Sequence, residues 1–132
     1  MSRRELREQI FKLLFRVEFN APEDMPEQVR LFFEQDDPID EQSQDEITQK
    51  YEKIVENLPK IDEMLDQTAT GWTKDRMAKV ELTILRLAVY EIRMDETIPV
   101  SVAINEAVEL AKKFGQDESS SFVNGVLAKF AK

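Results

Sequence analysis

Three arginines near the start of the chain could bind the phosphates of a nucleic acid. Arg3 and Arg7 are four residues apart and Arg4 follows Arg3, so on a helix all three guanidinium groups can reach successive phosphates. The positive end of a helix dipole disfavours cations, so this placement lowers helix stability slightly and indicates a functional role. The alternative interpretation is a solvated helix end.

The segment 112–125 is a second candidate for binding RNA. Lys112 and Lys113 precede a loop rich in serine, and Phe122 follows it. Such a loop can hold phosphates through its cations and hydroxyls, and the phenylalanine ring can stack on an unpaired base. The alternative is a turn between two helices, in which Glu118 or a serine caps the second helix and Phe122 lies in the core.

Catalysis has no comparable set of residues. The chain has no histidine and no cysteine, which removes the most common general base, the thiolate nucleophile and the usual metal ligands. The carboxylates of residues 34–66 are typical of solvated helix faces, and the sequence lacks the glycine patterns of phosphate-binding and dinucleotide-binding loops. We therefore expect no enzyme activity, no cofactor and no metal site.

These candidate residues must be positioned by helices. The 132 residues suffice for one domain, and with only three glycines, five prolines and no alternating apolar pattern they predict an all-α fold. Apolar residues between 77 and 94 leave hardly any polar face, which predicts the central helix of the core. Seven helices are expected: one with apolar positions from 6 to 17, then about 26–35, 43–57, one from Pro59 to Gly71, one through 77–94 capped by Thr73, then 100–114 and 119–131.

Glycines and asparagines of the last two predicted helices suggest close packing. Gly115 is suited to end the first of them as a left-handed cap. Gly125 lies inside the second, where glycine costs about 1 kcal/mol relative to alanine, so we expect another helix or a ligand close to it. Asn105 and Asn124 stand in apolar surroundings and are expected to be buried amides with hydrogen-bond partners.

The net charge of −9 argues against nucleic-acid binding, but the charge is unevenly distributed. Residues 1–18 carry five basic and three acidic groups, residues 19–70 carry four and fifteen, and residues 71–132 carry nine of each. The two ends can therefore meet an anionic partner, while the middle repels it. Charges within the first dozen residues and within 77–94 predict neither a secretory signal nor a membrane span, so we expect a cytoplasmic protein.

Five runs in the C-terminal half form a specific pattern: 85–91 (LRLAVYE), 98–99, 102–112 (VAINEAVELAK), 114–115 and 122–127 (FVNGVL). This pattern closely resembles the NusB family of bacterial transcription antitermination factors. The run 3–8 is similar to the arginine-rich opening of that family, whereas residues 19–70 match only in length and helical pattern. The resemblance implies a NusB-like fold of seven helices in two packed helical subdomains, about 1–57 and 58–132, within one domain.

The resemblance also implies partners and site residues. Such proteins pair with ribosomal protein NusE, and the pair binds the single-stranded boxA element of nascent RNA. The complex joins RNA polymerase and other Nus factors and promotes read-through, notably of ribosomal RNA operons. The implied partner-binding residues are Phe15, Met77 and Glu81. The expected RNA-binding residues are Arg3, Arg4, Arg7, Glu118, Ser121 and Phe122, together with Lys112 and Lys113 of the basic segment.

Two departures from the family pattern bear on RNA affinity. Glu5 stands where many relatives are basic, and Ser120 and Ser121 replace more basic residues of some relatives, so NusE is expected to supply much of the affinity. A helical adaptor that binds only proteins is the alternative function, favoured by the acidic net charge. Some RNA cytosine methyltransferases carry a NusB-like domain before a catalytic domain, but 132 residues predict a standalone protein. Whether the free chain hides its RNA surface in a homodimer stays open.

Overall fold

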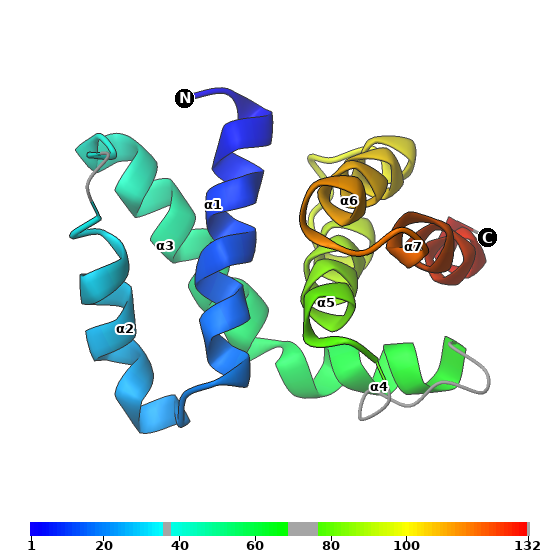
Figure 1. Ribbon diagram of the computed structural model, residues 1–132, viewed down its shortest axis with the longest axis horizontal. Coiled ribbons are helices and arrows are strands. Elements are labelled where there is room, and N and C mark those ends of the chain that lie inside the picture. The colour runs from blue at the N-terminus through cyan, green and yellow to red at the C-terminus, as the bar shows by residue number, and fades with distance from the viewer. Residues whose placement is uncertain (36–37, 69–76, 132) are drawn as a thin grey trace. The chain divides into compact units, whose positions relative to one another are not determined.

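The computed structural model describes residues 1–35, 38–68 and 77–131 (Figure 1). Over these residues the chain forms seven α-helices and no strand, which confirms the predicted all-α fold. Gly71 and Thr73, predicted to end one helix and to cap the next, lie outside the described residues. None of the described helices is long and apolar enough to cross a membrane. The elements are α1 (Arg3–Phe15), η1 (Arg16–Glu18), η2 (Pro22–Asp24), α2 (Met25–Phe32), α3 (Glu41–Glu56), α4 (Leu58–Thr68), α5 (Lys79–Met94), α6 (Val100–Phe114), α7 (Ser119–Ala128) and η4 (Lys129–Ala131), where η marks a 3-10 helix.

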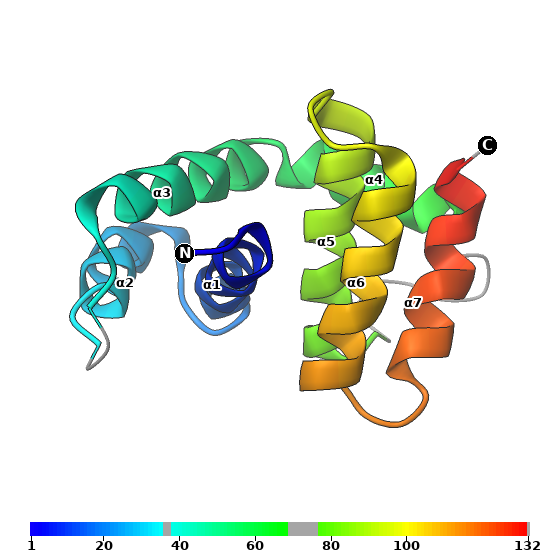
Figure 2. The same ribbon diagram turned by 90° about the horizontal axis from the view of Figure 1, so that it is seen from above.

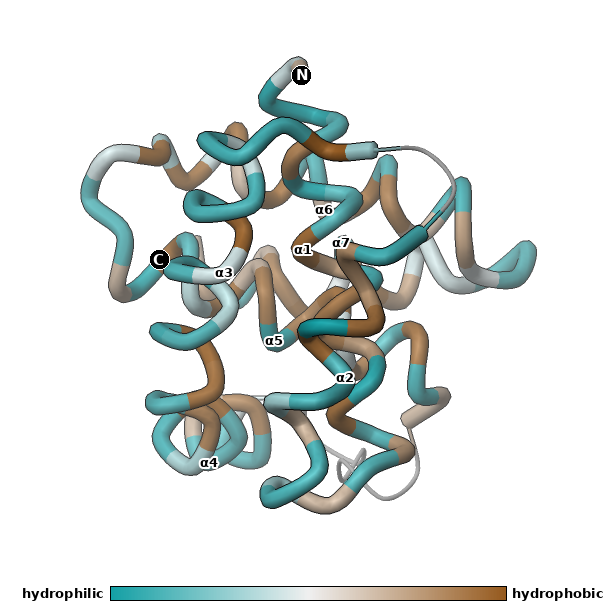
Figure 3. The backbone as a smooth tube through the Cα atoms, turned by 90° about the vertical axis from the view of Figure 1, so that its left-hand side faces the viewer, coloured by the Kyte–Doolittle hydropathy of each residue, from teal (hydrophilic) through white to brown (hydrophobic). Residues whose placement is uncertain are grey.

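The chain divides into two compact units, Met1–Val55 and Glu56–Lys132. In the first unit α2 and α3 lie beside α1, which is seen close to end-on in Figure 2. Hydrophilic and hydrophobic stretches alternate along these three helices (Figure 3), as expected for helices with one buried face. The buried residues of this unit include Leu6, Ile10, Phe11, Leu13 and Leu14 of α1, Met25 and Phe32 of α2, and Ile47, Tyr51 and Ile54 of α3.

Both α1 and α2 end earlier than the apolar pattern predicts. Helix α1 stops at Phe15 and continues as the 3-10 helix η1, and α2 stops at Phe32 rather than near residue 35. Asn20 Nδ2 donates a 2.8 Å hydrogen bond to the carbonyl oxygen of Arg16, and Gln35 Nε2 donates one of 3.0 Å to that of Phe32. These side-chain amides satisfy carbonyl groups that a longer helix would use, which favours ending the helix there.

Helix α5 is the centre of the second unit, as predicted. Ten consecutive residues of α5, from Leu82 to Glu91, are buried. The helix contacts α4, α6, α7 and η4, and Figure 2 shows α5, α6 and α7 running side by side. A helix that buries residues in every direction must be covered by neighbours all round, so α5 organises the whole unit.

A buried ion pair joins α4 to α5. Arg86 Nε and Nη2 donate hydrogen bonds of 2.9 Å to the two carboxylate oxygens of Asp62. Arg86 is 7% and Asp62 8% exposed. Guanidinium and carboxylate match in such a bidentate pair, and removing one partner would leave a buried charge uncompensated. The pair therefore specifies how α4 is seated on α5.

The two asparagines predicted to be buried amides, Asn105 and Asn124, are exposed. Ala103 and Ala107 form part of the buried face of α6, and Asn105 stands two residues from each, about 200° away around a helix of 3.6 residues per turn. Asn124 is likewise two residues from the buried Val126 of α7. Both amides therefore lie on outer faces, and the prediction is wrong.

We expect Ile84→Ala or Leu85→Ala to lower the free energy of unfolding by roughly 2–5 kcal/mol, because a cavity would remain where a fully buried side chain stood. Both residues are 0% exposed. Val102→Ala on α6, where the side chain is 43% exposed, is the control and should change stability by less than about 0.5 kcal/mol. Chemical denaturation measures all three, and losses below about 0.5 kcal/mol at both core positions would contradict a central α5.

Candidate nucleic-acid interface

A capping box closes the N-terminus of α1. Ser2 Oγ accepts a 3.0 Å hydrogen bond from the Glu5 backbone N–H, and Glu5 Oε1 accepts one of 3.1 Å from the Ser2 N–H. The hydrogen bond that the carboxyl accepts from the Ser2 backbone N–H and, to a lesser degree, one with the Ser2 side chain hold the pKa of the Glu5 carboxyl below its ordinary value. The negative charge of this carboxylate interacts favourably with the positive end of the helix dipole. This interaction offsets the unfavourable position of the neighbouring arginines. The sequence Ser2-Arg3-Arg4-Glu5 has the spacing of a capping box and would have predicted it.

The three arginines occupy the first two turns of α1 with different exposure. Arg3 and Arg4 are exposed, and Arg7 is half-buried. The side chain of Arg3, 82% exposed, forms an ion pair in which Nη1 lies 2.8 Å from Oε2 of Glu46 on α3. Glu46 is 43 residues away along the chain, and no sequence pattern indicated this partner. Arg3 and Arg4 are thus accessible, and Arg3 has an acidic neighbour.

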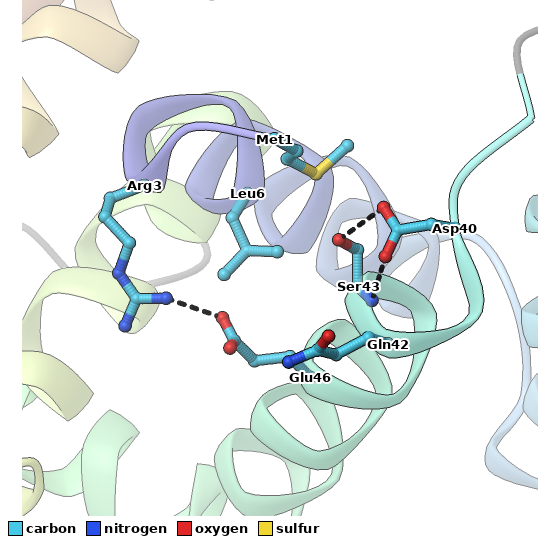
Figure 4. A pocket seen from close by; sticks show the side chains of 7 residues that line it. All are labelled: Met1, Arg3, Leu6, Asp40, Gln42, Ser43 and Glu46. Atoms are coloured by element: carbon cyan, nitrogen blue, oxygen red, sulfur yellow. Dashed lines mark hydrogen bonds and ion pairs between the residues drawn. The ribbon is translucent and has the colours of Figure 1, made fainter.

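A cavity of about 250 Å³ lies between the start of α1 and the start of α3 (Figure 4). Asp40 caps α3, because its carboxylate accepts hydrogen bonds of 3.0 Å from the Ser43 N–H and 2.8 Å from Ser43 Oγ. Among the lining side chains, the two carboxylates of Asp40 and Glu46 outnumber the one guanidinium of Arg3, and the N-terminal amino group of Met1 adds a second positive charge. The cavity is lined by Met1, Arg3, Leu6, Asp40, Gln42, Ser43 and Glu46.

Lys112 and Lys113 stand in the last turn of α6 and are exposed. Lys112 Nζ lies 3.6 Å from Oε1 of Glu109, and Lys113 Nζ lies 5.5 Å from the centre of the Phe114 ring. The negative end of the helix dipole favours cations at this position, so the lysines also stabilise α6. They offer two positive charges beside the turn that leads to α7.

The turn between α6 and α7 requires glycine at position 115, but not for the predicted reason. Gly115 has φ −93° and ψ −166°, an extended rather than left-handed conformation. A Cβ there would lie 2.6 Å from both Cβ and Oγ of Ser119 and 2.8 Å from the carbonyl oxygen of Ala111. Gly125 is the opposite case, since a Cβ there would meet nothing within 4 Å among the described residues outside its own helical turn. The predicted left-handed cap at Gly115 and the predicted approach of another helix to Gly125 are therefore wrong.

Ser119 links this turn to α5 through two hydrogen bonds of its hydroxyl group. Its Oγ accepts a 3.0 Å hydrogen bond from the Gln116 backbone N–H and donates one of 2.8 Å to Oε2 of Glu81. Ser119 is only 3% exposed, so both bonds lie largely away from water. The start of α7 is therefore held in place by a residue of the central helix, which the sequence did not indicate.

Glu118, Ser121 and Phe122 share one face at the start of α7, since residues three and four apart are neighbours on a helix. Glu118 and Ser121 are exposed, and Phe122 is half-buried. Glu118 occupies the N-cap position without a side-chain capping bond, although its carbonyl oxygen accepts a 3.1 Å hydrogen bond from the Phe122 N–H. Phe122 is therefore neither a fully buried core residue nor a free ring.

The three residues expected to meet a partner differ in accessibility. Phe15 is half-buried. Its ring stacks on that of Phe11, with 6.0 Å between the ring centroids, and meets the ring of Phe19 edge-on, with 5.0 Å between the centroids. Phe19 is 59% exposed and extends this aromatic cluster onto the surface, although the sequence did not single it out. Glu81 is half-buried. Met77 is only 6% exposed, so its side chain has little surface to offer.

Comparisons with known proteins agree along the whole chain. The NusB family model matches residues 4–132. The transcription antitermination protein NusB of Agathobacter rectalis is 52% identical over 132 residues, which are 99% of this chain and 100% of that protein. The structure of T. maritima NusB is 34% identical with a TM-score of 0.88, over 99% of this chain and 91% of that one. A structure of antitermination factors NusB and NusE in complex with dsRNA is 23% identical with a TM-score of 0.84, over 97% and 94% of the two chains, and shows the same fold.

Gly115→Ala and Gly125→Ala should change stability in opposite directions. The methyl group at 115 would collide with Ser119 and a backbone oxygen, and we expect a loss on the order of 1–3 kcal/mol, the usual effect of overpacking. The same methyl at 125 meets open space, and alanine is the better helix former by about 1 kcal/mol, so that variant should gain stability. Chemical denaturation tests both variants, and a shift of the same sign and size in each would refute this account of the turn.

Proposed function

Because this chain belongs to the NusB family, we propose that it is a transcription antitermination factor that binds boxA-type single-stranded RNA together with ribosomal protein NusE. The observation that carries the proposal is the 52% identity, over 99% of this chain and the whole of the other, with a protein named for this activity. The complex would join RNA polymerase and other Nus factors in the cytoplasm and promote read-through, notably on ribosomal RNA operons. The chain itself would catalyse no reaction and need no cofactor or metal.

We propose that two elements supply the RNA contacts, one from each helical subdomain, about 1–57 and 58–132. The arginines of α1 would bind phosphates, which carry most of the affinity of such complexes. The exposed carboxylate of Glu118 can only accept hydrogen bonds, so it suits a base amino group rather than a phosphate. Phe122 would stack on a base. The proposed set is Arg3, Arg4, Arg7, Lys112, Lys113, Glu118, Ser121 and Phe122.

Charge supports a basic partner such as NusE. The net charge of −9 arises mainly in residues 19–70, where fifteen acidic groups face four basic ones. A basic protein would be attracted to this chain and would add cations to an RNA surface that carries Glu5 and Ser121. Phe15 and Glu81 retain surface for such a contact, whereas the buried Met77 would act as support. The same acidity favours the second candidate, an adaptor that binds only proteins.

Titration of a labelled boxA-type single strand decides between the two functions. We expect tighter binding by this chain with NusE than by either protein alone.

Replacing Arg3, Arg4 and Arg7 by alanine should weaken the binding of RNA of any sequence and flatten the salt dependence of that binding. Phe122→Ala should weaken RNA binding by about 1–3 kcal/mol, because base stacking is lost. A duplex of the same sequence belongs in the series, because the solved NusB–NusE complex holds dsRNA. Unchanged affinity in both variants would leave only the protein adaptor.

Glu81→Gln tests the partner surface without disturbing the fold. The amide keeps an oxygen that can accept the hydrogen bond from Ser119, whereas lysine would remove it. Loss of the charge should slow association with NusE by about two- to fivefold at low salt and reduce its salt sensitivity. Ser119→Ala is the control, since it removes the internal bond and leaves the charge. Equal association rates of Glu81→Gln and the unaltered chain at low salt would exclude Glu81 from the interface.

A further inference from the structure

Glu46 is an acidic residue held directly against the proposed RNA surface. Its Oε2 lies 2.8 Å from Nη1 of Arg3, the first cation of the arginine cluster, and 45% of its side chain is exposed. Both residues belong to the first compact unit. The pair joins the start of α1 to the start of α3. Glu46, a residue of the acidic segment 19–70, therefore lies beside the arginine cluster of α1.

The surroundings of this pair are also acidic. The neighbouring cavity has Asp40 and Glu46 on its wall (Figure 4). The hydroxyl of Ser43 and, to a lesser degree, its backbone N–H hold the pKa of the Asp40 carboxyl below its ordinary value, so this group stays ionised. This side of Arg3 carries two carboxylates against the single positive charge of the Met1 amino group, so the open side of the guanidinium is the more favourable approach for a phosphate.

We propose that Glu46 is an intramolecular competitor of the RNA backbone: its carboxylate occupies Arg3 in the free chain and weakens the binding of phosphate there. This inference rests on the proposed RNA-binding function. The competition does not require the ion pair to break, because a phosphate bound by the other donors of Arg3 would still lie beside a like charge. A ligand would need contacts at further positions to bind well, which disfavours single, isolated anions.

The expected effect is small and depends on salt. An ion pair with side chains 82% and 45% exposed belongs to the weak class of surface pairs, so its competition should change RNA affinity by no more than about fivefold. Added salt screens it. A phosphate contact carries no base information, so the effect should be equal for a boxA-type strand and for a strand of unrelated sequence.

Glu46→Gln should therefore raise the affinity for single-stranded RNA by about two- to fivefold at low salt. The slope of log affinity against log salt should become steeper by up to about 0.7, the value for one further phosphate contact on a single strand. Glu52→Gln is the matched control, because Glu52 is exposed on the same helix, six residues further on, and the charge change is identical. In an Arg3→Ala background, Glu46→Gln should have no effect.

Each other outcome identifies what fails. If the unaltered chain, with and without NusE, binds no RNA, the proposed function itself is wrong. If the chain binds RNA but Glu46→Gln leaves affinity unchanged or lowers it, Glu46 is not a competitor. An equal gain in Glu52→Gln, or a gain that persists without Arg3, would mean that only net charge matters. Because a gain in affinity is expected, misfolding cannot imitate it, and equal denaturation midpoints would verify the fold.

Discussion

The second unit depends on one constraint: the central ten residues of α5 are buried on every side of the helix. Ten consecutive residues are buried, including Arg86 and Glu91, so α4, α6 and α7 must cover the helix from several directions. Arg86 makes this arrangement specific, because its guanidinium finds a bidentate partner only where Asp62 of α4 lies opposite. An apolar side chain would allow α4 to pack on α5 in several positions. A buried charge allows only the position in which it has an ionic partner.

This rigid centre extends to the proposed functional residues through short-range contacts. Ser119 joins the start of α7 to Glu81 at the start of α5, and the close approach at Gly115 leaves that turn little freedom. These contacts restrain the backbone that carries the exposed Glu118 and Ser121, and restraint of this kind lowers the entropic cost of binding. In the first unit the capping box of Ser2 and Glu5 does the same for Arg3 and Arg4.

The helices and the core could be predicted from the sequence because both follow from the local period of apolar residues. Features that depend on contacts between distant segments could not. The sequence suggested a special role for Gly115, but only the structure distinguishes a left-handed cap from a close approach by Ser119. The apolar neighbours of Asn105 and Asn124 predict buried amides, although a shift of two residues turns a side chain to the opposite face of a helix. The pairing of Arg3 with Glu46 across 43 residues left no local signal, whereas the capping box did.

The central claim is that RNA meets this chain at both the start of α1 and the segment 112–122, and avoids the acidic middle. Crosslinking tests it most directly: a boxA-type single strand with photoreactive uridines is irradiated in complex with this chain and NusE, and the attached peptides are identified by mass spectrometry. The account predicts crosslinks from this chain within residues 1–7 and 112–122. Crosslinks confined to residues 19–70, or found only on NusE, would contradict it.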